Sequence, residues 1–339
     1  MGDILHALPA VTALRQAHPD WRIDWVVEPR WRALLAADGS QSAQTPAQPL
    51  VDHLHFAATK LWRKAPFSRQ TRSEFMALRA ALKDGAYDAV IDLQGAIRSS
   101  LLARLTGCKR IIGEADPRER VARWLYSDRV ATRGAHVIEQ ALELASAIAG
   151  DNLPPVAPLL PMDPQAEAWA DEILPLSAKQ SAVLINPGAG WGAKRWPAER
   201  YAAVAQGLVE RGCRVLVNAG PGEEQLAEVI VRGTGGAATA LTCSLAQLIA
   251  LTRRIALAVA GDTGPLHLAC ALRVPVVGIY GPTDPGRNGP FGTRFTVLRS
   301  PQSRRDHTRY EAPEAGLLTI QSGDVLRAAT ALLYPETAL

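Results

Sequence analysis

The residues best placed to do chemistry lie in the segment GDTGPLH, residues 261–267, which follows the apolar stretch Ile255 to Ala260. That stretch predicts a buried strand, and Pro265 in the first turn of a following helix would cost no hydrogen bond. The free N–H groups of a helix start and the helix dipole together attract a diphosphate. Thr263 could add a hydroxyl donor, and His267 lies one turn further along. Taken alone, the segment fits an ordinary strand-to-helix turn with a core histidine equally well.

Three more Gly-rich turns follow predicted strands in the same half of the chain. Residues 186–190 (NPGAG) precede Lys194, whose ammonium could meet a phosphate while the glycines allow close backbone approach. Residues 220–224 (GPGEE) end in two glutamates, which could accept hydrogen bonds from ribose hydroxyls or could simply begin a helix. Residues 280–285 (YGPTDP) close a fourth strand. Together the four turns predict a nucleotide-diphosphate site more strongly than any one of them.

Positive charge gathers in the other half of the chain. Residues 60–72 (KLWRKAPFSRQTR) hold five lysines and arginines and no acid, and residues 117–133 hold five arginines, although the formal net charge is only +4. An anionic partner for this half is one reading, and a solvated basic face is the other.

Chain length and composition limit the class of protein that can carry these groups. A chain of 339 residues with 47% hydrophobic residues is globular and long enough for two domains. No apolar run reaches the roughly 18 residues of a membrane span, and the acid at Asp3 argues against a signal peptide. The cysteines have no metal-ligand spacing, so we expect reduced thiols in a cytoplasmic protein. They are Cys108, Cys213, Cys243 and Cys270.

The apolar patterns alternate between strands and helices. Strands are expected at 22–27, 89–93, 109–113, 181–186, 213–218, 238–241, 255–260 and 274–280. Helices are expected at 74–83, 97–106, 136–149, 198–211, 225–231, 266–272 and about 323–333, with one more that begins at Ser244. This rhythm predicts two parallel, doubly wound α/β domains, and the proline-rich residues 150–163 are the expected linker between them. Ligands in such folds bind beyond the carboxyl ends of the strands.

The start of the chain departs from this rhythm. Residues 1–19 read as a loop followed by a helix, with no strand to feed the loop. Because the absence of a central strand would leave two neighbouring strand edges unpaired, we expect that the first strand is missing from this sequence and that the sequence begins at an internal Met.

The pieces MGDILHALPAV, DWVVE, WRK, DLQG, NPGAGWGAKRWP, GDTGPLHLA and YGPTDP resemble the bacterial ADP-heptose:lipopolysaccharide heptosyltransferases of glycosyltransferase family 9, over nearly the whole chain. The resemblance implies a GT-B fold, two Rossmann-like domains that face a cleft. Residues 1–158 would bind the acceptor, with the C-terminal helix at 324–339 packing back on them, and residues 159–323 would bind the ADP-sugar.

The resemblance also implies an activity. The family inverts the anomeric centre and needs no metal or other cofactor, and DWVVE with the Trp62–Lys64 cluster looks most like the members that transfer heptose from ADP-heptose to the Kdo region of Kdo-lipid A. The alternatives are heptosyltransferase II, another sugar transferase of this family, or a non-catalytic sugar-nucleotide-binding homologue. A lipid acceptor implies peripheral contact with the inner face of the inner membrane. We expect a monomer and no nucleic-acid partner.

Site residues follow from the resemblance position by position. Asp3 would be the general base that deprotonates the acceptor hydroxyl, although it could instead cap a helix. Where some relatives have hydroxyl residues before the donor lysine, this chain has Ala189 and Gly190, so phosphate would rest on backbone N–H groups there. The donor would be held by Lys194, Gly188, Ala189, Gly190, Glu223, Glu224, Asp262, Thr263, Gly264 and His267. The anionic acceptor would be held by Arg63, Lys64, Gln94, Arg118 and His136.

Overall fold

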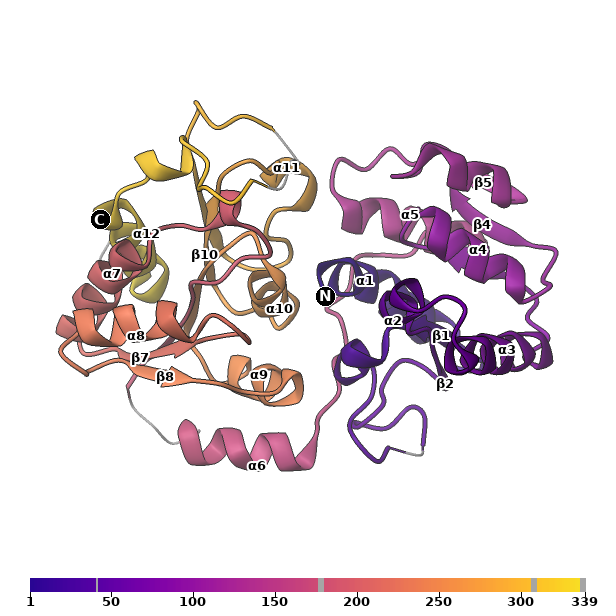
Figure 1. The fold of residues 1–339 in the computed structure, drawn as a ribbon, viewed down its shortest axis with the longest axis horizontal. Helices are drawn as coiled ribbons and strands as arrows, with labels where there is room; N and C mark the ends of the chain where they lie inside the picture. Colours follow the sequence, from indigo (N-terminus) through magenta and orange to yellow (C-terminus); the bar gives the residue numbers. More distant parts are fainter. Residues whose placement is uncertain (41, 176–179, 306–309, 336–339) are drawn as a thin grey trace. The chain divides into compact units, whose positions relative to one another are not determined.

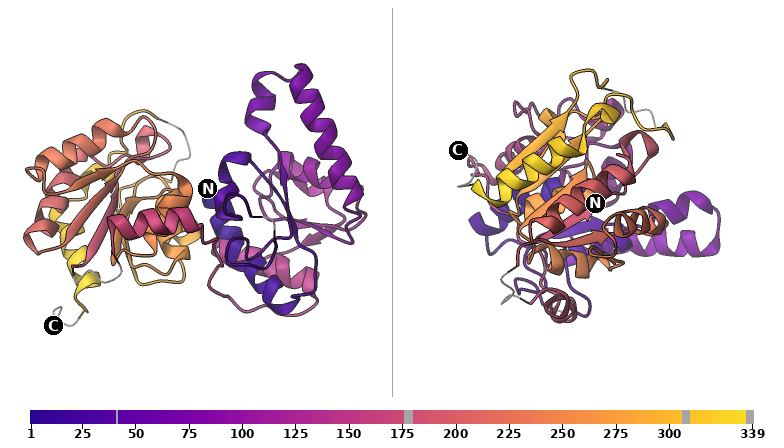
Figure 2. Two further views of the ribbon diagram at one scale, coloured as in Figure 1. Left: turned by 90° about the horizontal axis from the view of Figure 1, so that it is seen from below. Right: turned by 90° about the vertical axis from the view of Figure 1, so that its left-hand side faces the viewer.

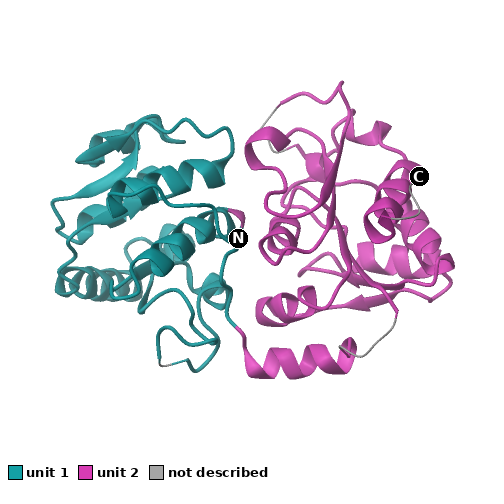
Figure 3. Ribbon diagram, turned by 180° about the vertical axis from the view of Figure 1, so that it is seen from behind, with its two compact units in different colours: residues 1, 3–161 teal, residues 2, 162–339 magenta. Residues whose placement is uncertain are grey.

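The computed structural model describes residues 1–339 except 41, 176–179, 306–309 and 336–339 (Figure 1). The chain divides into two compact units, the first ending at Pro161 and the second beginning at Met162 (Figure 3). This division lies close to the domain boundary expected at residue 158, and residues 151–163, between the last helix of the first unit and the first helix of the second, form neither helix nor strand.

The second unit is built on one parallel sheet of six strands. The order across the sheet is β11 (Phe295–Arg299), β10 (Val276–Tyr280), β9 (Leu257–Gly261), β6 (Ala182–Asn186), β7 (Arg214–Asn218) and β8 (Thr239–Leu241). Its helices are α6 (Pro164–Ile173), α7 (Ala198–Glu210), α8 (Glu224–Gly233), α9 (Leu245–Thr252), α10 (Gly264–Ala271), α11 (Pro285–Asn288) and α12 (Ser322–Leu333). If the six strands are numbered 1 to 6 along the chain from β6 to β11, their order across the sheet is 6-5-4-1-2-3, so the unit is a doubly wound Rossmann-like domain.

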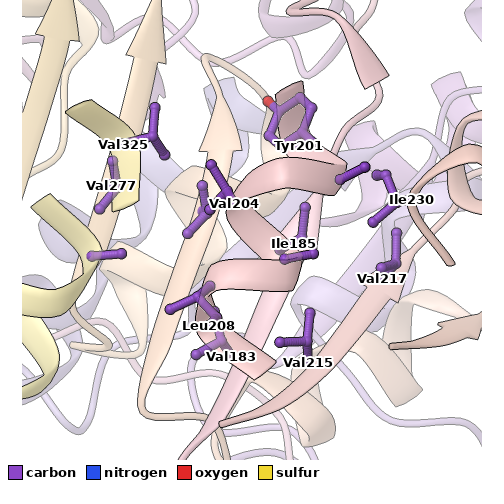
Figure 4. Packing of buried hydrophobic residues seen from close by; sticks show 14 of the residues in the cluster. Val183, Ile185, Tyr201, Val204, Leu208, Val215, Val217, Ile230, Val277 and Val325 are labelled. Atoms are coloured by element: carbon purple, nitrogen blue, oxygen red, sulfur yellow. The ribbon is translucent and has the colours of Figure 1, made fainter. Parts of the chain in front are cut away.

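The core of the second unit lies between this sheet and three helices, α7, α8 and α12. Val183 and Ile185 of β6 point toward Val204 and Leu208 of α7 (Figure 4). Each of the central strands β6, β9 and β10 is buried at every position, as expected for parallel strands covered on both faces.

Helix α12 packs in the core of the second unit. Val325 and Ala329 lie one turn apart, are fully buried, and belong to the core that α7, β9 and β10 build. The apolar stripe of α12 is therefore used in the second unit, and the packing of residues 324–339 against the first domain stays a prediction. Residues 336–339 lie outside the described residues.

The first unit contains two separate parallel sheets instead of one. β1 (Asp24–Val27) pairs with β2 (His53–Phe56), and β3 (Val90–Asp92), β4 (Ile111–Glu114) and β5 (Asp128–Val130) form the other sheet. The helices are α1 (Gly2–Ala17), α2 (Thr59–Lys64), α3 (Arg69–Asp84), α4 (Ile97–Leu105) and α5 (Val137–Ala149). The predicted opening loop is not present, since α1 already begins at Gly2.

A cavity of about 830 Å³ lies between the two sheets of the first unit. Its walls include Trp25 and Val26 of β1 and Val90 and Ile91 of β3, and α1, α3 and α4 contribute apolar side chains. In the part of the chain that the structure describes, β1 pairs only with β2 and β3 only with β4, so each keeps one strand edge without a strand partner. Within the same described ranges, no helix is long and apolar enough to cross a bilayer.

Candidate functional site

The second unit brings its Gly-rich turns together where the strand order reverses. β6 pairs with β7 on one side and with β9 on the other, and Asn186 at the end of β6 lies opposite Ala260 of β9. Ligands of doubly wound sheets bind at the carboxyl ends of the two strands that flank such a reversal. The turn that leads to Lys194 and the turn that contains Asp262 leave from these two strand ends.

Lys194, Asp262 and His267 form one buried group, called here the donor cluster. Lys194 Nζ contacts Asp262 Oδ2 and lies 3.3 Å from the Asp262 carbonyl oxygen, and His267 Nε2 is 3.1 Å from Asp262 Oδ1. Burial alone would raise the pKa of Asp262, but the hydrogen bond with His267 and the charge of Lys194 outweigh it and hold that pKa far below its ordinary value. Asp262 is therefore an anion that fixes the position of the lysine.

Two further contacts fix Lys194. Its ammonium lies 4.3 Å from the ring centroid of Trp191, a cation–π contact that the sequence did not predict. The 3-10 helix Gly192–Lys194 is also held by the segment that follows residue 309, because Ala193 N donates to Tyr310 O at 3.0 Å. A Cβ on Gly192 would lie 1.6 Å from the Glu311 carbonyl oxygen, so only glycine allows this approach.

Helix α10 begins beside the donor cluster. Thr263 is its N-cap and makes no side-chain capping bond, since its hydroxyl donates to the Gly261 carbonyl at 3.2 Å. Gly264 and Pro265 occupy the first two helical positions. The N–H groups of the first helical turn have no acceptor within the helix, so this end of α10 offers backbone donors and the positive end of a dipole.

The two glutamates after β7 have different positions. Glu223 Oε2 accepts a hydrogen bond from Gly220 N at 3.0 Å, and a Cβ on Gly188 would lie 2.0 Å from the same oxygen. Glu223 therefore lies against the turn that follows β6. Glu224 is exposed and accepts from Gly222 N at 3.0 Å, and backbone hydrogen bonds lower its pKa. Of the pair, only Glu223 is brought to the other donor residues.

Ala189 and Gly190 complete the turn after β6. Ala189 is buried, whereas Gly190 is exposed and has open space where a Cβ would project. Within the described residues, the turn is therefore open on the side to which a Gly190 side chain would project.

Polar groups that the sequence analysis did not single out lie at the same strand ends. Asn218 Nδ2 donates to Asn186 Oδ1 at 2.8 Å, which ties the ends of β6 and β7 together. Asn186 Nδ2 and Thr283 Oγ1 are buried, and within the described residues neither has a hydrogen-bond partner. Buried polar groups are normally paired. The Gly-rich turns at 186–190 and 280–285 contain these two residues, but only tertiary burial distinguishes them from the other polar residues of those turns.

The first unit brings three predicted residues together. Gln94 Nε2 donates to Asp3 Oδ2 at 2.9 Å, and Arg118 Nη1 lies 3.7 Å from the same oxygen. Asp3 is in the first turn of α1 and its side chain is 56% exposed, so its carboxylate stays accessible. An oriented, accessible carboxylate beside an arginine can act as a general base for a bound hydroxyl.

Asp92, a buried residue at the end of β3, builds the loop that carries Gln94. Its carboxylate accepts hydrogen bonds from Gln94 N at 3.0 Å, Gly95 N at 3.1 Å and the Tyr126 hydroxyl at 2.7 Å. Gly95 adopts a positive φ of 64°, and a Cβ there would lie 3.1 Å from Arg118 N. The loop therefore places Gln94 and Arg118 side by side.

The remaining predicted acceptor residues are placed differently. His136 is a buried N-cap of α5 whose Nδ1 accepts from Ile138 N at 3.2 Å, and its ring lies 5.9 Å from that of His6 on α1. This geometry gives His136 a structural role, and its contact with an acceptor stays a prediction. Arg63 and Lys64 are exposed at the end of α2, and in the described part of the chain no hydrogen bond or ion pair joins them to Asp3.

Two cations that the sequence analysis did not assign to the site share a cavity with Asp3. Lys60 and Arg98 line the same cavity as Asp3 and Gln94. Arg98 Nη1 donates to Thr59 Oγ1 at 3.1 Å, which holds α2 and α4 together at this end of the sheets. Lys60 belongs to the basic run at 60–72, which was the available signal for it.

With this geometry established, comparison with known proteins identifies the class. The chain belongs to glycosyltransferase family 9 (heptosyltransferase), because the sequence model of this family matches residues 75–317. The protein is therefore a glycosyltransferase with the GT-B fold.

Lipopolysaccharide heptosyltransferase 1 of Escherichia coli (strain K12) is 32% identical over 311 residues, which cover 89% of this chain and 91% of that protein. The protein of the same name from Pseudomonas aeruginosa is 31% identical over 305 residues, 88% of this chain and 81% of that protein. The structure of E. coli heptosyltransferase WaaC with ADP matches 96% of this chain and 95% of its own, with a TM-score of 0.77 and 29% identity.

Proposed function

We propose that the protein transfers heptose from ADP-heptose to the Kdo region of Kdo-lipid A in lipopolysaccharide core synthesis, with inversion and without a metal. The names of its relatives support the reaction class. The single observation that carries the proposal is the donor cluster, a buried Lys194–Asp262 pair beside the start of α10 at the reversal of the strand order.

The donor cluster matches the demands of ADP as a leaving group. As the anomeric carbon parts from the β-phosphate oxygen, negative charge grows on that phosphate. Lys194 and the N–H groups at the start of α10 stabilise this charge, because both are fixed before the reaction begins. Asp262 holds Lys194 and does not itself touch the phosphate, since two anions in contact repel. Glu223, against Gly188, accepts hydrogen bonds from the ribose hydroxyls.

The first unit supplies the other half of the reaction. Asp3 takes the proton of the acceptor hydroxyl while the new bond from that oxygen to the anomeric carbon forms and the bond to ADP breaks. Attack opposite the leaving group in one step gives inversion. Gln94 and Arg118 hold the Asp3 carboxylate, and the cations Lys60, Arg63 and Lys64 meet the carboxylates of Kdo.

A transfer assay with radiolabelled ADP-heptose tests this function. Label is expected in Kdo-lipid A, and Asp3→Ala is expected to abolish transfer while the affinity for ADP stays unchanged. Asp3→Asn keeps the hydrogen bond with Gln94 but removes the base, so it separates proton transfer from positioning. Normal turnover by Asp3→Ala would show that the base is elsewhere.

The acceptor distinguishes this proposal from its rivals. Transfer only to an acceptor that already carries one heptose would assign the activity of heptosyltransferase II instead. ADP binding without transfer to either acceptor would favour a non-catalytic homologue.

A further inference from the structure

The tip of one helical hairpin in the first unit is not explained by the transfer reaction. Helices α2 and α3 form a hairpin (residues 59–84) that extends away from the rest of the unit, drawn in purple in Figure 2. Its tip, residues 64–69, carries Phe67, which is 82% exposed and is the most exposed large hydrophobic side chain of the described residues. Leu61 and Met76, on the same hairpin, are 62% and 55% exposed.

The hairpin tip is built by specific contacts and is not a loose loop. Ser68 Oγ caps α3 by accepting from Thr71 N at 3.0 Å, and Thr71 Oγ1 donates to the Ala65 carbonyl at 2.9 Å. Further down, Trp62 Nε1 donates to Glu74 Oε2 at 2.7 Å and joins the two helices. Phe67 is therefore presented by a fixed scaffold.

Charge around Phe67 has one sign. Residues 60–72 hold five cations and no acid. The first acid beyond them, Glu74, already accepts hydrogen bonds from Trp62 and from Gln70 Nε2 at 2.9 Å. An exposed aromatic ring at a convex tip, surrounded by lysine and arginine, has the composition of a segment that lies in the interface of an anionic bilayer.

We propose that the hairpin tip docks on an anionic lipid bilayer, with Phe67 in the interface and Arg69 and Arg72 against the headgroups. The inference rests on the proposed function for its setting, because a lipid acceptor must be reached at a membrane. A bilayer accepts a convex apolar tip, whereas a folded partner would need a matching pocket to bury a single ring.

Vesicle co-sedimentation tests this docking without any transfer reaction. We expect the full chain to bind vesicles of phosphatidylcholine with about one third phosphatidylglycerol, to bind pure phosphatidylcholine much more weakly, and to be released by high salt. Phe67→Ser should weaken binding by about tenfold. Arg69→Gln with Arg72→Gln should weaken it by about 25-fold, since one cation near an anionic surface contributes about fivefold.

A matched control uses an exposed phenylalanine elsewhere. Phe295 on β11 is 49% exposed, and Phe295→Ser should leave vesicle binding unchanged. Phe67→Ser should keep its melting temperature and its rate with an acceptor stripped of acyl chains, while the rate with Kdo-lipid A in vesicles falls. Equal vesicle binding by wild type and Phe67→Ser, or binding that is indifferent to lipid charge, would overturn the docking proposal.

The two proposals fail separately. Vesicle binding that depends on Phe67, together with no transfer to any acceptor, would refute the proposed function and support the docking surface. Transfer to the acyl-free acceptor without vesicle binding would do the reverse.

Discussion

Replacement of Lys194 by Met tests the donor cluster in both its stability and its chemistry. The side chains of Lys194 and Asp262 are 11% and 7% exposed, so Lys194→Met leaves a buried carboxylate without its cation. Loss of one partner of a buried pair costs about 3–5 kcal/mol, and His267 at 3.1 Å offsets part of this. We expect a loss of about 3 kcal/mol, which for a domain of this size lowers the melting temperature by about 6–12 °C.

The turnover of Lys194→Met should fall by more than its loss of stability can explain. Lys194→Met removes a fixed cation from the leaving diphosphate, and removal of one such group lowers kcat by about 10²–10³. The double variant Lys194→Met with Asp262→Asn removes the stranded carboxylate as well. Its melting temperature should recover to within a few degrees of wild type, while its turnover should stay low.

Scanning calorimetry and the radiolabelled transfer assay at saturating acceptor measure the two effects on the same samples. Recovery of turnover together with stability in the double variant would refute the reasoning, because Lys194 would then serve only to neutralise Asp262. An unchanged melting temperature in Lys194→Met would mean that the pair does not stabilise the fold.

Three further outcomes are expected. Gly188→Ala should raise the KM for ADP-heptose and destabilise the protein by about 1–3 kcal/mol, because its Cβ would lie 2.0 Å from the Glu223 carboxylate. In the double variant with Glu223→Ala, the stability that Gly188→Ala removes should be regained. The folded-state pKa of Asp262 is depressed. The stability that the Asp262 carboxylate contributes is therefore present above its unfolded pKa of about 3.9 and is lost as the pH falls below that value. The difference in melting temperature between wild type and Asp262→Asn should shrink between pH 5 and pH 3. Transfer should persist in excess EDTA, since Lys194 and the start of α10 carry the charge stabilisation, and a loss restored by Mg²⁺ would contradict this.

Much of the second unit could be predicted because its signals are local. Continuous apolar runs followed by Gly-rich turns predicted β6, β7, β9 and β10, and the segments after β6 and β9 contain the donor cluster. Short strands with weaker patterns were missed. β2 reads HLHF and contains two histidines, and β11 (Phe295–Arg299) lies at the sheet edge, where burial leaves less trace in the sequence.

The unpredicted features depend on contacts between distant segments. No local sequence pattern predicts the cation–π contact of Lys194 with the Trp191 ring, or the Thr283 hydroxyl that has no hydrogen-bond partner among the described residues. The apolar stripe of α12 shows that the helix must be buried but not against which sheet. Likewise, the helix expected at 136–149 was taken to begin at His136, and only the structure shows that the ring nitrogen of His136 caps a helix that begins at Val137.

The cavity of about 830 Å³ separates the edges of β1 and β3, which have no strand partner there among the described residues. In a continuous sheet each inner strand is protected from both sides, whereas the backbone amides of β1 and β3 that face the cavity have no neighbouring strand within the described residues. Amide hydrogen exchange should therefore be fast there and slow in β6 and β9, which are paired on both sides. An extended strand that lay between β1 and β3 would pair with both open edges at once and would join the two sheets into one.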